Sequence, residues 1–277
     1  MPFLALALLL ASILLVRAFG VERADYRRFD LAEREPQRLD FYRRWLRDLV
    51  LVYGGLSLVG LLALFVPQLL RGNWGGLPTL PTLVAAWPEL DAMLVDAQAR
   101  GPFPWLRGEH GPLGPILIAA VGGLMLLVLF AVLIPVALGR VDADAVYAAE
   151  AMIPRTRTET RYGAAMSVGA GVLEEALFRL ALPGLLYAAL GDAWLAFLLA
   201  GVVFALVHVY QGWVGTLAAG SIGIIFAGLY AVTGSILLVM LIHAVIDVRS
   251  LVLTPMLLRR SASRRPAAIR SIAQQDR

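Results

Sequence analysis

The segment GAAMSVGAGVLEEALFRLALPGLLYAAL, residues 163–190, has the length and apolarity of a membrane-spanning helix but contains three charged side chains. It is longer than the roughly 20 residues that a helix needs to cross a bilayer. The charged residues are Glu174, Glu175 and Arg179. Because ionisable groups at membrane depth are energetically expensive, we interpret these three residues as candidates for function.

The composition of the whole chain indicates an integral membrane protein. Of its 277 residues 60% are hydrophobic and 16% are charged, whereas soluble domains carry about 25% charged residues. The apolar residues occur in long blocks, which predict an all-α fold: a polytopic membrane helical bundle with about seven transmembrane helices. The predicted spans are Phe3–Val16, Leu49–Leu70, Leu113–Leu138, Gly163–Leu190, Ala193–Val209, Val214–Thr233 and Ile236–Leu258.

The distribution of arginine predicts the orientation in the membrane. All 24 basic residues are arginines. Nine lie in residues 17–48, four in 140–161 and six from residue 259 onward, but only three in 71–112. The positive-inside rule therefore predicts a cytoplasmic C-terminus, an external N-terminus and an external segment 71–112. This basicity fits anionic lipid head groups better than nucleic acid, and we expect a bacterial plasma (inner) membrane protein.

Three regions are expected along the chain. Residues 1–152 are predicted to form an N-terminal transmembrane scaffold, with a cytoplasmic arginine-rich linker at 17–48 and an external loop at 71–112. Part of 17–48 is either an interfacial helix, which Pro36 should interrupt, or a solvated linker. Residues 153–258 are predicted to form a catalytic helical bundle with very short turns between antiparallel helices. Residues 259–277 are expected to be a mobile basic cytoplasmic tail.

The helical spacing of the charged residues in segment 163–190 places them on different faces of the helix. Glu175 and Arg179 are four residues apart, so they can pair along one helical face. Glu174 is rotated away from that face and is free to point into the bundle. An ion pair that only stabilises helix packing is the alternative interpretation of Glu175 and Arg179.

Two further spans each contribute a polar side chain with a partner one turn away. Phe204 and His208 lie in the fifth span, and His243 and Asp247 lie in the seventh. Alone, His208 could be an interfacial or core residue, and His243 could form an intrahelical hydrogen bond with Asp247. Gathered in one bundle with Glu174, these groups can activate water and stabilise an oxyanion, which is the chemistry of peptide-bond hydrolysis.

The order E-E-x-x-x-R, then F-x-x-x-H, then H-x-x-x-D on successive apolar helices resembles the CPBP family of CAAX proteases and bacteriocin-processing enzymes, also called the Abi family. The resemblance covers about Ile153–Leu251 and includes the lead-in from Pro154 through Thr156 to Glu159. It implies a glutamic intramembrane endopeptidase that needs no metal and no other cofactor. Its substrate would be a membrane-associated peptide or protein, such as a bacteriocin leader or a C-terminal sorting signal.

The resemblance also implies a role for each residue of the set. Glu174 would activate the hydrolytic water with help from His208, and Glu175 and Arg179 would hold the charge arrangement of the site. His243 and the residue at position 247 would form the oxyanion pocket, and Phe204 would contact substrate. CAAX proteases carry Asn at the last position. Because a carboxylate donates a hydrogen bond only when it is protonated, Asp247 can orient His243 instead. These roles are carried by Glu174, Glu175, Arg179, Phe204, His208, His243 and Asp247.

Two other classes of protein remain open. Glu174, His208, His243 and Asp247 are all reasonable zinc ligands, so a metal-dependent membrane protease is one alternative, although the H-E-x-x-H motif is absent. A non-proteolytic scaffold, transporter or immunity factor on the same fold is the other. The absence of cysteine excludes a thiolate nucleophile. The expected partners are a peptide or membrane-protein substrate and the lipid bilayer, and the oligomeric state is left open.

Overall fold

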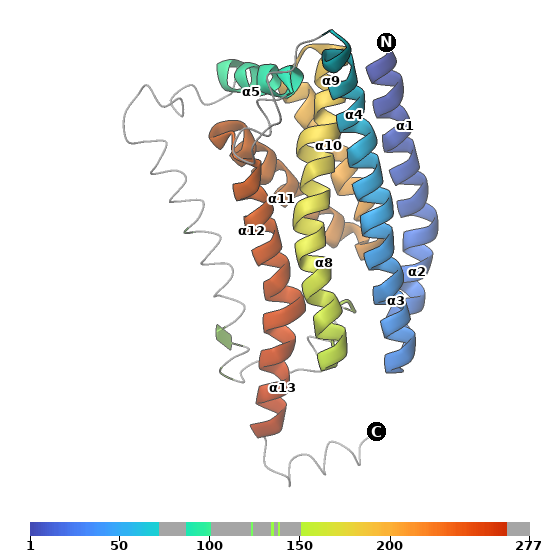
Figure 1. Ribbon diagram of the computed structural model, residues 1–277. Helices are drawn as coiled ribbons and strands as arrows, with labels where there is room; N and C mark the ends of the chain where they lie inside the picture. Colours follow the sequence, from blue (N-terminus) through green and yellow to red (C-terminus); the bar gives the residue numbers. More distant parts are fainter. Residues whose placement is uncertain (72–86, 101–122, 124–133, 136–137, 139–150, 265–277) are drawn as a thin grey trace.

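The computed structural model describes residues 1–71, 87–100 and 151–264, together with 123, 134, 135 and 138. In these residues the chain forms a bundle of long helices without strands (Figure 1). Short π-helical segments (η1, η2, η6, η8) and one 3₁₀ turn (η7) continue or join the α-helices. The elements in chain order are α1 (Pro2–Arg17), η1 (Ala18–Glu22), α2 (Arg23–Asp30), α3 (Glu35–Asp48), η2 (Leu49–Gly54), α4 (Gly55–Leu70), α5 (Pro88–Arg100), α8 (Arg157–Glu175), η6 (Ala176–Ala181), α9 (Leu182–Leu190), α10 (Ala193–Val207), η7 (Val209–Gln211), α11 (Gly212–Thr233), α12 (Ile236–Val248), η8 (Arg249–Leu253) and α13 (Thr254–Arg264).

Four helices in the described residues are long and apolar enough to cross a membrane, judged by length and composition. They are Pro2–Asp30, Glu35–Leu70, Val209–Thr233 and Ile236–Arg260, and α10 is a shorter apolar helix. The helix that runs without a break from Arg157 to Leu190 is also long, but it contains the three charged residues of the opening segment. The predicted all-α membrane bundle is confirmed, and the protein is an integral membrane protein.

Six of the seven predicted spans coincide with described helices. The first lies in α1, the second in η2 and α4, and the fourth in α8, η6 and α9. The last three lie in α10, in α11 and in α12 with its continuation. The third predicted span, Leu113–Leu138, lies almost entirely outside the described residues, as does most of the external segment 71–112.

Glycine and capping side chains make the turns between the last helices short. Gly191 and Gly234 end α9 and α11 with φ of 71° and 64°, a left-handed conformation that glycine adopts without a steric penalty. The next residue in each case begins a helix: Asp192 accepts a hydrogen bond from the backbone N–H of Leu195, and Ser235 accepts one from that of Leu238. The two turns therefore reverse the chain within two residues, as the sequence predicts.

The arginine-rich segment 17–48 is helical and partly buried. It forms η1, α2 and α3, which are broken only around residues 31–34. Pro36 does not interrupt α3 but stands in its first turn, where the missing N–H is harmless. Phe29, Phe41 and Tyr42 are almost fully buried and pack together. The prediction of a solvated linker at this position was therefore wrong, because aromatic side chains of α2 and α3 attach both helices to the bundle.

The ends of the bundle carry different elements. The α2–α3 turn, the start of α8 and the end of α13 all lie at the lower end in Figure 1, whereas α5 lies across the upper end. The arginine-rich segments thus gather at one end of the molecule. This arrangement is consistent with the predicted orientation, which stays a prediction because it depends on the membrane.

The packing of α8 against α12 gives a test of the fold. At Gly171 an added Cβ would lie 2.8 Å from the backbone nitrogen of Ala244 and 2.9 Å from the carbonyl oxygen of Met240. Because backbone atoms cannot move aside as a side-chain tip can, we expect Gly171→Ala to destabilise the bundle by about 1–3 kcal/mol. The thermal unfolding midpoint of the purified protein in detergent measures this effect. Gly228→Ala is the matched control, because nothing lies within 4 Å of its added Cβ; an equal loss there would contradict the prediction.

Candidate active site

A cavity of about 640 Å³ opens between the helices, and one of its walls carries polar side chains from three of them. Glu174 comes from α8, His208 from the end of α10, and His243 and Asp247 from α12. We call these four residues the polar wall. The structure therefore brings together four of the residues singled out by sequence. The volume is typical of sites that bind small molecules or short peptide segments.

The two adjacent glutamates face different surroundings. Glu174 is partly exposed and lines the cavity, whereas Glu175 is fully buried behind the wall. Glu175 Oε2 lies 3.2 Å from Arg179 Nε, and its Oε1 lies 2.7 Å from His243 Nδ1. The predicted pair between Glu175 and Arg179 is confirmed. The contact between Glu175 and His243, which is 68 residues away in the chain, was not predicted.

Arg179 is held in an apolar pocket by more than its carboxylate partner. Only 1% of the residue is exposed. Its Cζ lies 5.1 Å from the ring centroid of Phe204 and 5.9 Å from that of Phe226, and Nη1 donates to the carbonyl oxygen of Phe178. Cation–π contacts of this kind are strongest where water is excluded. Arg179 therefore does not line the cavity, and its positive charge balances the negative charge of Glu175 behind the polar wall.

His208 adopts a defined tautomer through the helix that precedes it. Its Nδ1 lies 2.8 Å from the carbonyl oxygen of Phe204. Because a carbonyl oxygen only accepts, Nδ1 must carry the hydrogen, and a neutral ring then keeps its lone pair on Nε2. His208 lines the cavity, so this arrangement suits a group that accepts a proton there. Phe204 contributes the orienting carbonyl.

The side chain of Phe204 is buried beneath the site. It is 2% exposed, packs edge to face on Phe178 with centroids 5.0 Å apart, and contacts the His208 ring at 4.7 Å. It is not among the residues that line the cavity. Contact between Phe204 and substrate stays a prediction, and in the structure its ring supports Arg179 and His208.

His243 lies between two carboxylates. Its Nδ1 donates to Glu175, and its Nε2 lies 3.7 Å from Asp247 Oδ2, one turn along α12. This distance is too long for a hydrogen bond but short enough for a favourable charge interaction. Asp247 therefore sits where it can orient His243, which is the second role that the sequence left open for it.

Sequence reasoning missed a second part of the cavity lining, which comes from the region predicted to be scaffold. Arg17 donates to Asp48 at 2.7 Å and lies 3.7 Å from Glu22. Trp45 and Tyr53 complete what we call the N-terminal wall. The many arginine and aromatic residues of segment 17–48 indicate that the segment has a role, but no spacing rule shows that it lies next to the polar wall. Only packing shows that the two walls face one cavity.

Possible metal ligands were also considered. In the described ranges, no group of three or more His, Asp or Glu side chains is placed so that it could hold a metal ion. The metal-dependent alternative therefore gains no support from the arrangement of the polar wall, and it is left to experiment.

One comparison with known proteins bears on this site. The family model described as type II CAAX prenyl endopeptidase Rce1-like matches residues 157–249. No curated protein and no solved structure matches the chain significantly. The matched residues contain the whole polar wall, Glu175 and Arg179, but not the N-terminal wall. The family resemblance read from the three motifs is confirmed.

The buried triad of Glu175, Arg179 and His243 makes a prediction about stability. Glu175→Leu leaves the buried Arg179 guanidinium without a carboxylate, so we expect a loss of about 3–5 kcal/mol. The double variant Glu175→Leu with Arg179→Met removes both charges and should regain the part of that loss that comes from the unpaired guanidinium, but neither the part that comes from the lost His243 hydrogen bond nor the activity. Thermal unfolding in detergent measures both. Equal destabilisation in the single and double variants would show that the charge pairing is not what matters at this position.

Proposed function

We propose that this chain, whose residues 157–249 form an Rce1-like domain of the CAAX protease family, is an intramembrane endopeptidase that cleaves membrane-associated peptides or proteins with a water molecule activated by Glu174 and His208. The family is a protease family, so a peptidase activity is supported at that level. The observation that carries the finer proposal is the division of the glutamate doublet: Glu174 lines the same cavity as His208, while Glu175 is buried in an ion pair.

The chemistry follows from this division. Glu174, as a carboxylate, removes a proton from water while the water oxygen attacks the carbonyl carbon of the substrate, giving a tetrahedral intermediate. The same proton then passes to the leaving nitrogen as the C–N bond breaks, which yields a carboxylic acid and an amine. His208, with a lone pair on Nε2, can share the proton of the water. No covalent enzyme intermediate is needed.

His243 is proposed to stabilise the oxyanion. A ring flanked by the carboxylates of Glu175 and Asp247 can hold a proton on both nitrogens, with Nδ1–H bonded to Glu175. Nε2–H then remains free to donate to the oxyanion on the cavity side. In this proposal Asp247 orients His243 and balances its charge, a role that differs from that of the neutral amide found in CAAX proteases, because an ionised carboxylate accepts but does not donate a hydrogen bond.

The location of the site suggests the class of substrate. The polar wall lies on helices that are apolar over most of their length, so the scissile bond belongs to a segment in or next to the membrane. A bacteriocin leader and the C-terminal sorting signal of a surface protein both fit this description. We place the protein in a bacterial plasma membrane, with its N-terminus outside and its C-terminus in the cytoplasm, on the arginine distribution.

The activity is tested by replacing each proposed proton-transfer group, and Glu174→Gln does so without changing the shape of the side chain. Glu174→Gln and His208→Ala should each lower cleavage by about 10²–10⁴-fold, because each removes a proton-transfer group. N- and C-termini of membrane proteins are compared in cells that carry wild-type protein, either variant or no protein. Fragments that disappear with Glu174→Gln identify the substrate and the cleavage site together.

The control for this experiment is Glu89→Gln in α5, which makes the same chemical change in a helix that lies across the upper end of the bundle in Figure 1, at a residue that does not line the cavity. It should leave the fragments unchanged. Full rescue of the null phenotype by Glu174→Gln, with no terminus altered, would refute the proposal and favour the non-proteolytic scaffold or immunity factor.

A metal chelator separates the proposed mechanism from the metal-dependent alternative. We expect cleavage by the purified protein to be unchanged after exhaustive treatment with a chelator, because the groups in the mechanism are Glu174, His208 and His243. The measurement is the initial rate on the identified substrate before and after treatment. Loss of activity that added zinc restores would instead show that these side chains are metal ligands.

A further inference from the structure

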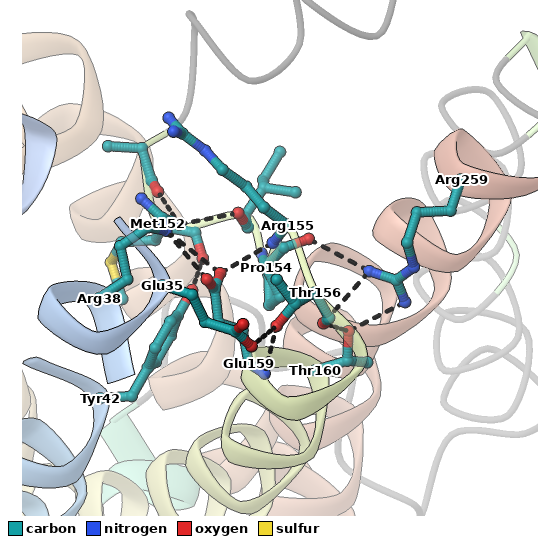
Figure 2. Close-up of polar contacts among 12 residues, drawn as sticks. Glu35, Arg38, Tyr42, Met152, Pro154, Arg155, Thr156, Glu159, Thr160 and Arg259 are labelled. Carbon is teal, nitrogen blue, oxygen red and sulfur yellow. Dashed lines mark hydrogen bonds and ion pairs between the residues drawn. The ribbon is translucent and has the colours of Figure 1, made fainter. Parts of the chain in front are cut away.

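Three successive backbone carbonyls before α8 are bound by two side chains of α3 (Figure 2). Arg38 Nη2 donates to the carbonyl oxygens of Ala151 and Ile153 at 3.1 and 3.2 Å. Tyr42 OH donates to the carbonyl oxygen of Met152, which lies between them, at 2.7 Å. Arg38 and Tyr42 are four residues apart on one face of α3. One helical turn thus fixes the backbone of an irregular segment.

A buried ion pair fixes the position of Arg38 itself. Its Nε lies 3.2 and 3.3 Å from the two carboxylate oxygens of Glu159, and the two residues are 1% and 0% exposed. The guanidinium also lies 4.3 Å above the ring centroid of Phe29. Glu159 in turn accepts from the backbone N–H of Arg155 at 2.8 Å. Because these hydrogen bonds and the ion pair are all made within the protein, the Arg38 side chain has little freedom to move.

The opposite side of the same segment is held by α13. Arg259 Nη2 donates to Thr160 Oγ1 at 3.0 Å, and its Nη1 lies 3.4 Å from the carbonyl oxygens of Pro154 and Thr156 (Figure 2). Segment 151–156 is therefore attached on one side to α3 and on the other to α13. The two helices are more than 200 residues apart in the chain.

The segment held in this way forms part of the cavity. Met152 and Ile153 both line it, and so does Trp45, one turn beyond Tyr42 on α3. The carbonyls of Met152 and Ile153 are bound by α3, so these two acceptors are satisfied within the protein. What these residues present to the cavity is apolar.

We propose that Arg38, Tyr42 and Glu159 are positioning residues that hold Met152 and Ile153 as the substrate-selecting wall of the cavity. This inference rests on the proposed endopeptidase function and deepens it. The wall is an apolar surface within the same cavity as Glu174 and His208, so it suits an apolar side chain beside the scissile bond. Met152 adds a flexible side chain that adapts to more than one shape. The residues that set this selection lie partly outside the segment 157–249.

Tyr42→Phe tests the proposal with the smallest change. It removes the hydrogen bond to the Met152 carbonyl and keeps the ring that packs on Phe29 and Phe41. The probes are fluorogenic peptides built on the cleavage site found by the terminus comparison, with Leu, Ser or Glu at each position that flanks the scissile bond. We expect wild-type protein to prefer Leu at one or more positions. In Tyr42→Phe the KM for those Leu peptides should rise about fivefold, the effect of one hydrogen bond, with kcat nearly unchanged.

Three further variants separate substrate selection from a general loss of stability. Tyr162→Phe also removes one hydrogen bond of a tyrosine hydroxyl, the bond that it accepts from Arg43 Nε at 3.1 Å, at a residue that does not line the cavity, and it should leave the preference unchanged. Met152→Leu should keep the preference for Leu peptides, whereas Met152→Ser should lose it. A rise of KM in Tyr162→Phe equal to that in Tyr42→Phe, or an unchanged preference in Met152→Ser, would overturn the proposal.

A second readout does not depend on activity. The chain has no cysteine, so Met152→Cys introduces a single thiol that a water-soluble maleimide can label. Adding Tyr42→Phe should speed labelling about fivefold, and adding Tyr162→Phe should not. Equal labelling in the two backgrounds would show that Tyr42 does not hold the segment. If wild-type protein cleaves no peptide, the endopeptidase function and the selection both fail, and labelling alone decides whether the segment is held.

Discussion

A buried charge in a membrane bundle must find a partner within the protein, and the centre of this structure is organised by that requirement. Arg179 cannot reach water, so Glu175 lies against it, and the remaining oxygen of Glu175 accepts from His243. One carboxylate thereby joins α8, η6 and α12. This pairing leaves Glu174, the adjacent residue, as the glutamate that lines the cavity. The two members of the doublet differ in role because they differ in surroundings.

A second buried pair joins the two halves of the chain. Arg38 and Glu159 are as completely buried as Glu175 and Arg179, and they link α3 to the start of α8. Around them the chain before α8 is bound through its own carbonyls and becomes part of the cavity. The N-terminal half is therefore more than a scaffold in this structure, because it supplies a wall of the cavity and holds another wall in place. The family match at residues 157–249 covers the polar wall but not these contributions.

Aromatic side chains connect the two halves on the side of His208. Tyr210 follows His208 by two residues, its ring lies 6.0 Å from the histidine ring, and it packs edge to face against Trp45 of α3 at 4.9 Å. Trp45 in turn contacts Phe41, which stacks on Phe29. A rigid cluster of rings thus extends from α2 to the end of α10. Precise placement of reacting groups depends on such support, since small displacements lower reaction rates strongly.

The sequence by itself determined the class of fold, six of the seven predicted spans, the short turns and the polar residues with local partners. Each of these depends on neighbours within one helical turn or on the length of an apolar block, and both can be read from spacing. The pair of Glu175 and Arg179 is of this kind. Only the tertiary structure decided that Glu175 also holds His243, that Phe204 packs beneath the site, and that Arg38 and Tyr42 bind the backbone of residues 151–153. These contacts join residues 25 to 115 positions apart, and their geometry depends on how whole helices pack, for which a single sequence carries no spacing rule.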